Sequence, residues 1–224
     1  MNSNYKVIKF RSNNSKEVDD QVSIEEPLEI ILKYKIKENW IENTISITMR
    51  TPGDDEDLVT GFLFNERVIE KINHIENIQA SGEPVGQYKL KNKIIVTINN
   101  SENIDIDKIK RNFLTNSSCG VCGKTSLESL EIIKKDKIIK SIPKINHEII
   151  MKSPDILRQE QSEFSKTGGI HASGLFNAGG GVIAVKEDVG RHNALDKLIG
   201  FVLKKELLDN SSQFLTCSGR LNFD

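Results

Sequence analysis

Cysteine, aromatic residues and long apolar runs are all scarce in this sequence. Three cysteines occur among 224 residues, an odd number that does not suit the paired disulfides of a small secreted domain. No stretch approaches the roughly 18 consecutive apolar residues of a membrane helix. The first residues also lack the charged and then apolar layout of a secretory signal. We therefore expect a cytoplasmic protein with no membrane segment, in which the cysteines are reduced thiols, take part in redox chemistry or bind a metal.

The chain also has almost no net charge. The chain has 31 basic and 32 acidic residues, which gives a formal charge of −1. Because a strong basic excess is the electrostatic signature of a nucleic-acid binder, we expect no nucleic-acid partner. The remaining composition, 37% hydrophobic and 28% charged, is that of a soluble globular protein long enough to bury a substantial core.

The spacing of apolar residues predicts strands that alternate with helices. Short apolar or alternating runs predict strands over residues 30–34, 44–49, 94–98, 172–176, 182–185 and 214–217. Helical spacing predicts helices from residue 54, over 104–113 and 125–133, from Ser153-Pro154 to Gly168-Gly169, and after His192. Such alternation indicates the α/β class.

The domain organisation is predicted to be simple. Residues 1–21 are polar enough to form a mobile arm, and residues 22–224 form one domain. This domain has two lobes, 22–115 and 125–224, separated by a loop over residues 116–124.

That loop carries two cysteines, Cys119 and Cys122, separated by two residues. Two such thiols can share a metal, form a reversible disulfide, or let one thiolate attack while the other resolves the product. A structural zinc site usually needs four ligands, and the third cysteine, Cys217, is distant in the sequence and has no paired neighbour. Gly120, Gly123 and the helix predicted after them favour a thiolate over a buried thiol. We expect a reactive centre without a metal.

A second group of chemically capable side chains lies near the C-terminal end of the sequence. His171 is predicted to start a strand, where ligand sites of α/β proteins often form. Two acids, a guanidinium group, an imidazole and a third acid then follow within ten residues, as Glu187, Asp188, Arg191, His192 and Asp196. Such a cluster binds a polar ligand or holds itself together by salt bridges.

Five segments, taken together and in order, resemble one family, that of the formate dehydrogenase accessory sulfurtransferases (FdhD). The last of them is far more specific than any two-cysteine motif. They are Arg50-Thr51-Pro52-Gly53-Asp54-Asp55, Gly61-Phe62-Leu63, Ser118-Cys119-Gly120-Val121-Cys122-Gly123, Thr167-Gly168-Gly169-Ile170-His171-Ala172, and residues 187–197 (EDVGRHNALDK).

The resemblance implies a fold related to the cytidine deaminases, with a mixed sheet flanked by helices, and a homodimer. It implies that a cysteine desulfurase donates sulfur as a persulfide, held on Cys119 with help from Cys122. The sulfur then passes to the molybdenum cofactor, Mo-bis(molybdopterin guanine dinucleotide), before this cofactor is inserted into formate dehydrogenase.

Residues in the matching segments are candidates for binding this cofactor or a GDP-like nucleotide. Arg191 and Lys197 suit phosphate groups, and Asp188 suits the donor edge of guanine. Glycines allow a close approach of the ligand to the backbone. The full set of predicted binding residues is Gly168, Gly169, His171, Gly180, Asp188, Arg191, His192 and Lys197.

Two other functions remain open, and the end of the chain departs from the family. A zinc nucleobase deaminase needs a glutamate two residues after its histidine, but Ser173 follows His171 at that distance. A non-catalytic cofactor chaperone would use the cysteines only for structure or redox protection.

Ser218-Gly219-Arg220 normally precedes about forty further residues in the family, so we expect a shortened C-terminal end.

Overall fold

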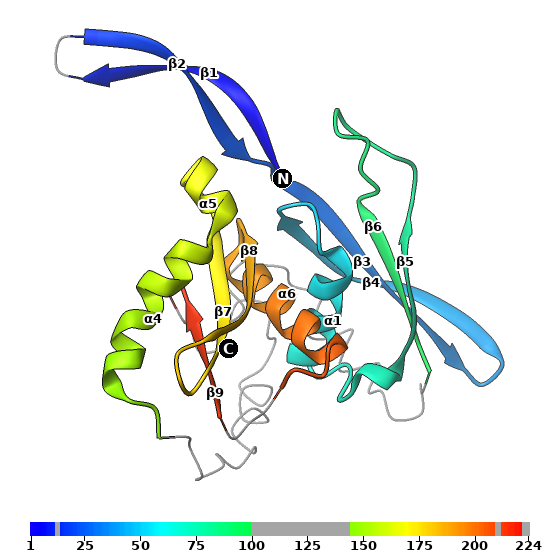
Figure 1. Cartoon of the computed structure of the whole chain (residues 1–224). Coiled ribbons are helices and arrows are strands. Elements are labelled where there is room, and N and C mark those ends of the chain that lie inside the picture. Colours follow the sequence, from blue (N-terminus) through cyan, green and yellow to red (C-terminus); the bar gives the residue numbers. More distant parts are fainter. Residues whose placement is uncertain (12–13, 100–143, 209–211, 221–224) are drawn as a thin grey trace.

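A computed structural model of the chain describes residues 1–11, 14–99, 144–208 and 212–220. Its elements are shown in Figure 1. In chain order they are β1 (Asn2–Arg11), β2 (Asn14–Ser23), β3 (Glu26–Ile36), β4 (Asn39–Arg50), α1 (Asp55–Asn65), η1 (Ile72–His74), β5 (Ile75–Ser81), β6 (Lys93–Ile98), α4 (His147–Glu160), α5 (Ser162–Thr167), β7 (His171–Asn177), β8 (Val182–Asp188), α6 (Arg191–Lys204) and β9 (Gln213–Cys217).

All six predicted strands are confirmed, and the α/β class with them. The predicted helices over 104–113 and 125–133, and the loop with Cys119 and Cys122, lie outside the described residues. Across the part of the chain that is described, no helix has the length and apolar character needed to span a membrane.

The described strands form one ribbon and two larger sheets. β1 and β2 pair only with each other, and β8-β7-β9 form an antiparallel sheet of three strands. The third sheet has the order β4-β3-β6-β5, in which β3 and β6 run parallel while the other pairs are antiparallel. A mixed sheet is therefore present, as predicted, whereas the relation to the cytidine deaminases stays a prediction.

The four-stranded sheet buries one face because its apolar residues alternate along each strand. Leu28, Ile30, Leu32 and Tyr34 of β3 point inward with Ile94 and Val96 of β6. Helix α1 covers this face with Leu58, Val59 and Leu63. Asp54 precedes the helix, and Asp55, Glu56 and Asp57 occupy its first turn, where acids complement the positive end of the helix dipole.

Helices α1 and α6 cross between the two sheets at very close range (Figure 1). A methyl group at Gly61 would overlap the backbone carbonyl of Asp196, and one at Gly200 would overlap the backbone carbonyl of Asp57. Glycine at these two positions is what allows the two backbones to touch. On its other side α6 packs Leu198 and Val202 against Leu175 of β7. The two helices together therefore connect the two sheets.

Helix α4 begins earlier than the sequence analysis predicted. We expected Ser153-Pro154 to start it, but the helix begins at His147, with Asn146 as its cap, and Pro154 lies inside it. Proline at this position cannot donate to the carbonyl four residues before it, which belongs to Ile150. The hydroxyl group of Ser153 donates to that carbonyl instead, at 2.9 Å. The predicted stop is confirmed, since Gly168 ends α5 in a left-handed conformation.

The N-terminal segment, predicted as a polar arm over residues 1–21, forms the β1–β2 hairpin, which projects from the body of the molecule (Figure 1). It is anchored near its base by the N-terminal amino group of Met1, which lies 3.3 Å from Glu163 of α5, and by two further contacts with the same helix. Ser23 and Thr167 share a hydrogen bond between their hydroxyl groups at 2.9 Å, and Asn2 donates to Glu163 at 2.9 Å.

Candidate functional site

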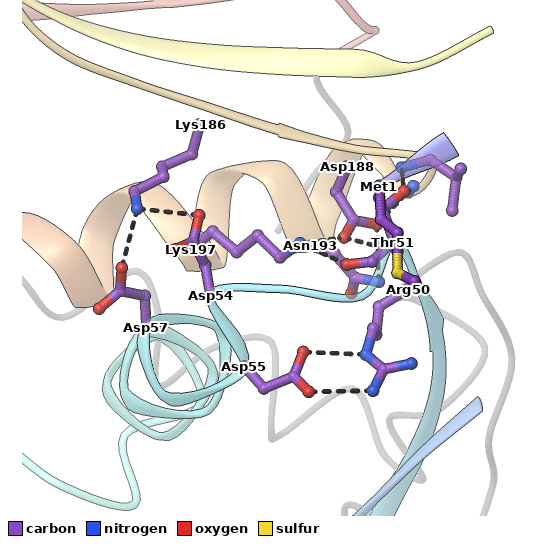
Figure 2. A network of polar contacts seen from close by, with 12 residues as sticks. Met1, Arg50, Thr51, Asp54, Asp55, Asp57, Lys186, Asp188, Asn193 and Lys197 are labelled. Carbon is purple, nitrogen blue, oxygen red and sulfur yellow. Dashed lines mark hydrogen bonds and ion pairs between the residues drawn. The ribbon is translucent and has the colours of Figure 1, made fainter. Parts of the chain in front are cut away.

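The centre of the candidate site is a buried ion pair between Asp188, the last residue of β8, and Lys197 of α6. Lys197 Nζ lies 2.7 Å from Asp188 Oδ2, and the two residues are 2% and 0% exposed. Lys197 also donates to the carbonyl oxygen of Thr51 at 2.7 Å, and the Thr51 N–H donates to Asp188 Oδ2 at 3.0 Å. The pair therefore holds the loop after β4, as Figure 2 shows.

Asn193 extends this network from the first turn of α6. Its amide donates to the carbonyl of Met49 at 2.7 Å and to Asp188 Oδ1 at 3.2 Å, and Oδ1 also accepts the N–H of Gly190 at 2.9 Å. Thr48 in turn donates to the amide oxygen of Asn193 at 3.1 Å. Three residues of the EDVGRHNALDK segment thus bind the backbone around residues 49–51.

Charged pairs fix the same loop from its other side (Figure 2). Arg50 is fully buried and holds Asp55 through two parallel contacts of 2.9 Å, and it donates to the carbonyl of Glu26 at 3.2 Å. Lys186 of β8 lies 3.0 Å from Asp54 and 2.9 Å from Asp57. Such two-pronged arginine contacts fix geometry as well as charge, so the segment over residues 50–57 has a fixed shape.

A cavity of about 290 Å³ lies beside this loop. It is bounded by residues 51–54, by β8 and by the junction of α4 and α5, and Lys197 is the one predicted binding residue in its wall. Charges of both signs line it, from Asp54, Glu160, Glu163, Lys186, Glu187 and Lys197. Its size is near the lower end of small-molecule sites.

A second group of predicted residues meets at the start of β7. His171 lies opposite Asp188 in the strand register. A methyl group at Gly219 would lie 3.0 Å from the Cβ of Arg191 and 3.3 Å from His171 Nδ1, so these three residues lie together. Arg191 Nε is buried and has no hydrogen-bond partner in the described structure, which is unusual for a charged donor.

Seven of the eight predicted binding residues therefore gather around this end of β7, and Gly180 does not. Gly168 and Gly169 directly precede the strand, and no atom lies within 4 Å of a methyl group built at Gly168. Gly180 lies in the turn between β7 and β8, close to Ile149. This turn follows the far end of a seven-residue strand, about 20 Å away at the usual rise per residue. The ligand role of each residue stays a prediction.

Some structural roles near the site could not be read from the sequence. Glu187 accepts the N–H groups of Glu163 and Phe164, both at 2.9 Å, and so caps α5. Asp196 accepts from Asn65 at 2.7 Å, and burial raises the pKa of its carboxyl group from 3.8 to about 7. In the described residues, no group of three or more His, Cys, Asp and Glu side chains is arranged to hold a metal.

The chain that carries this site belongs to a known family of proteins. A model of the FdhD/NarQ family matches residues 24–224, and the chain is a member of that family. It is 42% identical over 208 residues to the sulfur carrier protein FdhD of Picrophilus torridus, covering 92% of this chain and 73% of the relative. It is 36% identical over 220 residues to the sulfur carrier protein FdhD of Saccharolobus solfataricus, covering 98% and 77%.

A solved structure agrees with this assignment. A protein of Desulfotalea psychrophila, described as a formate dehydrogenase accessory protein, superimposes with a TM-score of 0.65 at 25% identity. The match covers 98% of this chain and 75% of the other.

Proposed function

We propose that this chain is a sulfur carrier that serves a molybdenum-dependent formate dehydrogenase. The observation that carries the proposal is the family match over residues 24–224, a range that includes the two-cysteine loop. The names of the relatives support it, since they are called sulfur carrier proteins. The name of the structural neighbour adds the link to formate dehydrogenase.

The proposed chemistry is a thiol exchange. A thiolate of Cys119 attacks the outer sulfur of a persulfide on a cysteine desulfurase, forms a new S–S bond and releases the donor's cysteine as a thiolate. Cys119 then carries the sulfur as a persulfide, and Cys122 assists its delivery. The acceptor is the molybdenum cofactor, Mo-bis(molybdopterin guanine dinucleotide), which is the cargo of the reaction.

The residues around the start of β7 are the proposed cofactor contacts. Arg191 is the strongest of them because a buried guanidinium N–H without a partner matches a phosphate oxygen. His171 lies beside it, and the open space at Gly168 leaves room for a ligand close to the backbone. A GDP-like nucleotide fits the same chemistry.

Asp188 and Lys197 play a different part in this proposal. Their charged groups already bind each other and the backbone of Thr51, so we assign them to positioning. They fix the turn that presents Arg191 and His192 at the start of α6.

Intact-mass spectrometry tests the carrier function. After incubation with a cysteine desulfurase and cysteine, the protein should gain one sulfur, about 32 Da, that a reductant removes. The gain should disappear in Cys119→Ala and persist in Cys217→Ser, which alters the cysteine that is distant from the loop in the sequence. A wild-type protein that gains no sulfur would favour the non-catalytic cofactor chaperone.

A deaminase function is disfavoured by the residue that follows the histidine. Ser173 stands where the proton-transferring glutamate is required, and it is buried and donates to Cys217 Sγ at 3.4 Å. The proposed deaminase-like fold therefore comes without the acid that this reaction needs.

A further inference from the structure

Strand β8 lies at one edge of its sheet, with β7 between it and β9 (Figure 1). A strand at an edge presents a row of backbone N–H and C=O groups that its own sheet does not use. Such a row binds an extended peptide, which adds a further strand to the sheet, when the space beside the edge is open.

The direction of the backbone groups in β7 is fixed by one hydrogen bond to the end of β9. The N–H of Ser218 donates to the carbonyl of Ala172 at 2.9 Å, so the backbone groups of Ala172 face β9. Neighbouring residues of a strand direct these groups to opposite sides. The backbone groups of His171 and Ser173 therefore face β8.

The same alternation leaves two residues of β8 with outward backbone groups. Asp188 and Lys186 lie directly opposite the two residues of β7 that face them, so their backbone groups bond within the sheet. Those of Val185 and Glu187 consequently point away from it. Val189, the next residue in this alternation, agrees with this direction, because its N–H donates across the edge to a hydroxyl group of the loop after β4 at 3.1 Å.

The space beside these outward groups is the cavity of about 290 Å³. Val185 and Glu187 line it on one side, and residues 51–54 line it on another. Among the described residues, none bonds to the outward backbone groups of Val185 and Glu187. The loop therefore leaves room for a short stretch of another chain beside the edge.

The wall of this cavity carries more acid than base. Four carboxylates and two lysines line it, from Asp54, Glu160, Glu163, Glu187, Lys186 and Lys197. Both lysines already bind acids, since Lys197 pairs with Asp188 while Lys186 is shared by Asp54 and Asp57. Glu160 is exposed and has no ion-pair partner in the described structure. The charge of the cavity therefore suits a cationic side chain.

We propose that the edge of β8 binds an extended segment of a partner protein, and that this segment carries a basic side chain. Its backbone pairs with the outward groups of Val185 and Glu187. Residues directly opposite in paired strands share a face, and the side chain of Glu187 lies toward α5, whose first N–H groups it accepts. A basic residue opposite Glu187 is therefore on the same side as Glu160 and Glu163.

This docking site is independent of the sulfur chemistry. None of the groups that form it belongs to the loop with Cys119 and Cys122, so a failure of the docking proposal would leave the carrier proposal intact.

Fluorescence anisotropy with a fluorescein-labelled peptide, TVRVT with an amidated end, tests the binding. Its β-branched residues favour an extended strand, and its central arginine supplies the charge. A glutamate in place of this arginine should weaken binding about tenfold, because an attraction becomes a repulsion. If none of these peptides binds, or if the arginine and glutamate peptides bind equally, the proposal is wrong.

Methylated peptides test the pairing of backbones. A methyl group on the backbone nitrogen of the arginine removes a hydrogen bond to β8 and should weaken binding about tenfold. The matched control carries the methyl group on the next valine, whose N–H points away from β8, and should bind within about twofold of the parent peptide. The reverse order of the two would contradict the proposed geometry.

A charge exchange tests the place of binding. Glu160→Lys should weaken the arginine peptide about tenfold and strengthen the glutamate peptide. The variant should fold, since Glu160 is the last residue of α4, where a lysine complements the helix dipole. Asp155→Lys is the matched control, because Asp155 is an exposed acid of the same helix outside the cavity. Equal effects of the two substitutions would place the peptide elsewhere.

Amide hydrogen exchange followed by NMR distinguishes the peptide from other occupants of the edge. The amides of Val185 and Glu187 should exchange freely in the protein alone and slowly once the peptide is bound. The amide of Lys186, which bonds to β7, should be protected in both states. Protection of Val185 and Glu187 before peptide is added would mean that this chain or a second copy already covers the edge, and it would overturn the proposal.

Discussion

Lys197 Nζ lies 2.7 Å from Asp188 Oδ2 in a part of the molecule that solvent does not reach. The two residues belong to α6 and β8, while the backbone that they hold belongs to the loop after β4. Residues 51 and 188 are 137 positions apart in the chain. The ion pair thus connects the two halves of the chain.

Removing one partner of this pair should be costly. Lys197→Met leaves the carboxylate of Asp188 buried without its counter-charge, and we expect the free energy of unfolding to fall by about 3–5 kcal/mol. Urea unfolding followed by circular dichroism measures this. Lys204→Met is the control on the same helix, because Lys204 pairs with Glu56 and Asp57 at a partly exposed position and its loss should cost less than about 1 kcal/mol. Similar losses in the two variants would refute the special role of the buried pair.

The crossing of α1 and α6 makes a second prediction about stability. Gly61→Ala and Gly200→Ala each force a methyl group into a backbone carbonyl, so both should lower the yield of folded protein or the melting temperature sharply. Gly169→Ala is the matched control, since the nearest atom lies 3.9 Å from the added methyl group. Thermal unfolding by differential scanning fluorimetry compares the three. If the helix variants melt like the control, the crossing is looser than described.

Asp196 predicts a dependence of stability on pH. Burial raises its pKa in the folded state to about 7 from 3.8, so between these values the folded chain binds more protons than the unfolded chain. This group therefore makes the protein less stable as the pH rises from about 4 to 7, and its cost is fully present above that range. Asp196→Asn keeps an oxygen for Asn65 and removes the titration.

The variant should consequently gain stability over the wild type at pH 8 and lose that advantage near pH 4. Urea unfolding at a series of pH values measures the difference between the two proteins. A difference that does not change with pH would show that Asp196 titrates normally in the folded state.

Arg191 gives a prediction about binding. Arg191→Lys keeps the charge but loses the planar set of donors that matches a phosphate, and we expect GDP to bind about tenfold more weakly, a loss of about 1.4 kcal/mol. Isothermal titration calorimetry measures this affinity. Arg158→Lys is the control, because Arg158 stacks on the ring of Phe164 and is not among the predicted binding residues. GDP binding that is the same in all three proteins would remove Arg191 from the site.

The elements that the sequence predicted well are those whose apolar pattern is local. Strands β3, β6 and β7 were found because each is buried and rich in apolar residues. Strand β5 was missed because few of its side chains are buried, and β1 and β2 because charged residues interrupt their alternation. The start of α4 was wrong because proline was taken as a beginning, whereas Ser153 replaces the hydrogen bond that Pro154 cannot make.

The sequence predicted which residues lie at the site better than it predicted what those residues do there. Asp188 and Lys197 were chosen as ligand contacts because their charges suit a nucleotide. They bind each other and backbone groups of Thr51 instead. Because any residue presents the same backbone groups, no sequence pattern reveals the contacts with Thr51. Gly180 was grouped with the others by composition, although its place in the hairpin turn separates it from them.

The glycine crossing also affects how a mutational survey of this protein should be interpreted. A selection for the activity of this protein would score Gly61 and Gly200 as intolerant of every substitution, the pattern usually taken to mark a catalytic residue. Measuring cellular protein abundance in parallel would separate the two causes. Variants at these glycines would vanish from the soluble fraction, whereas variants at a residue that only carries sulfur would accumulate normally and fail in activity alone.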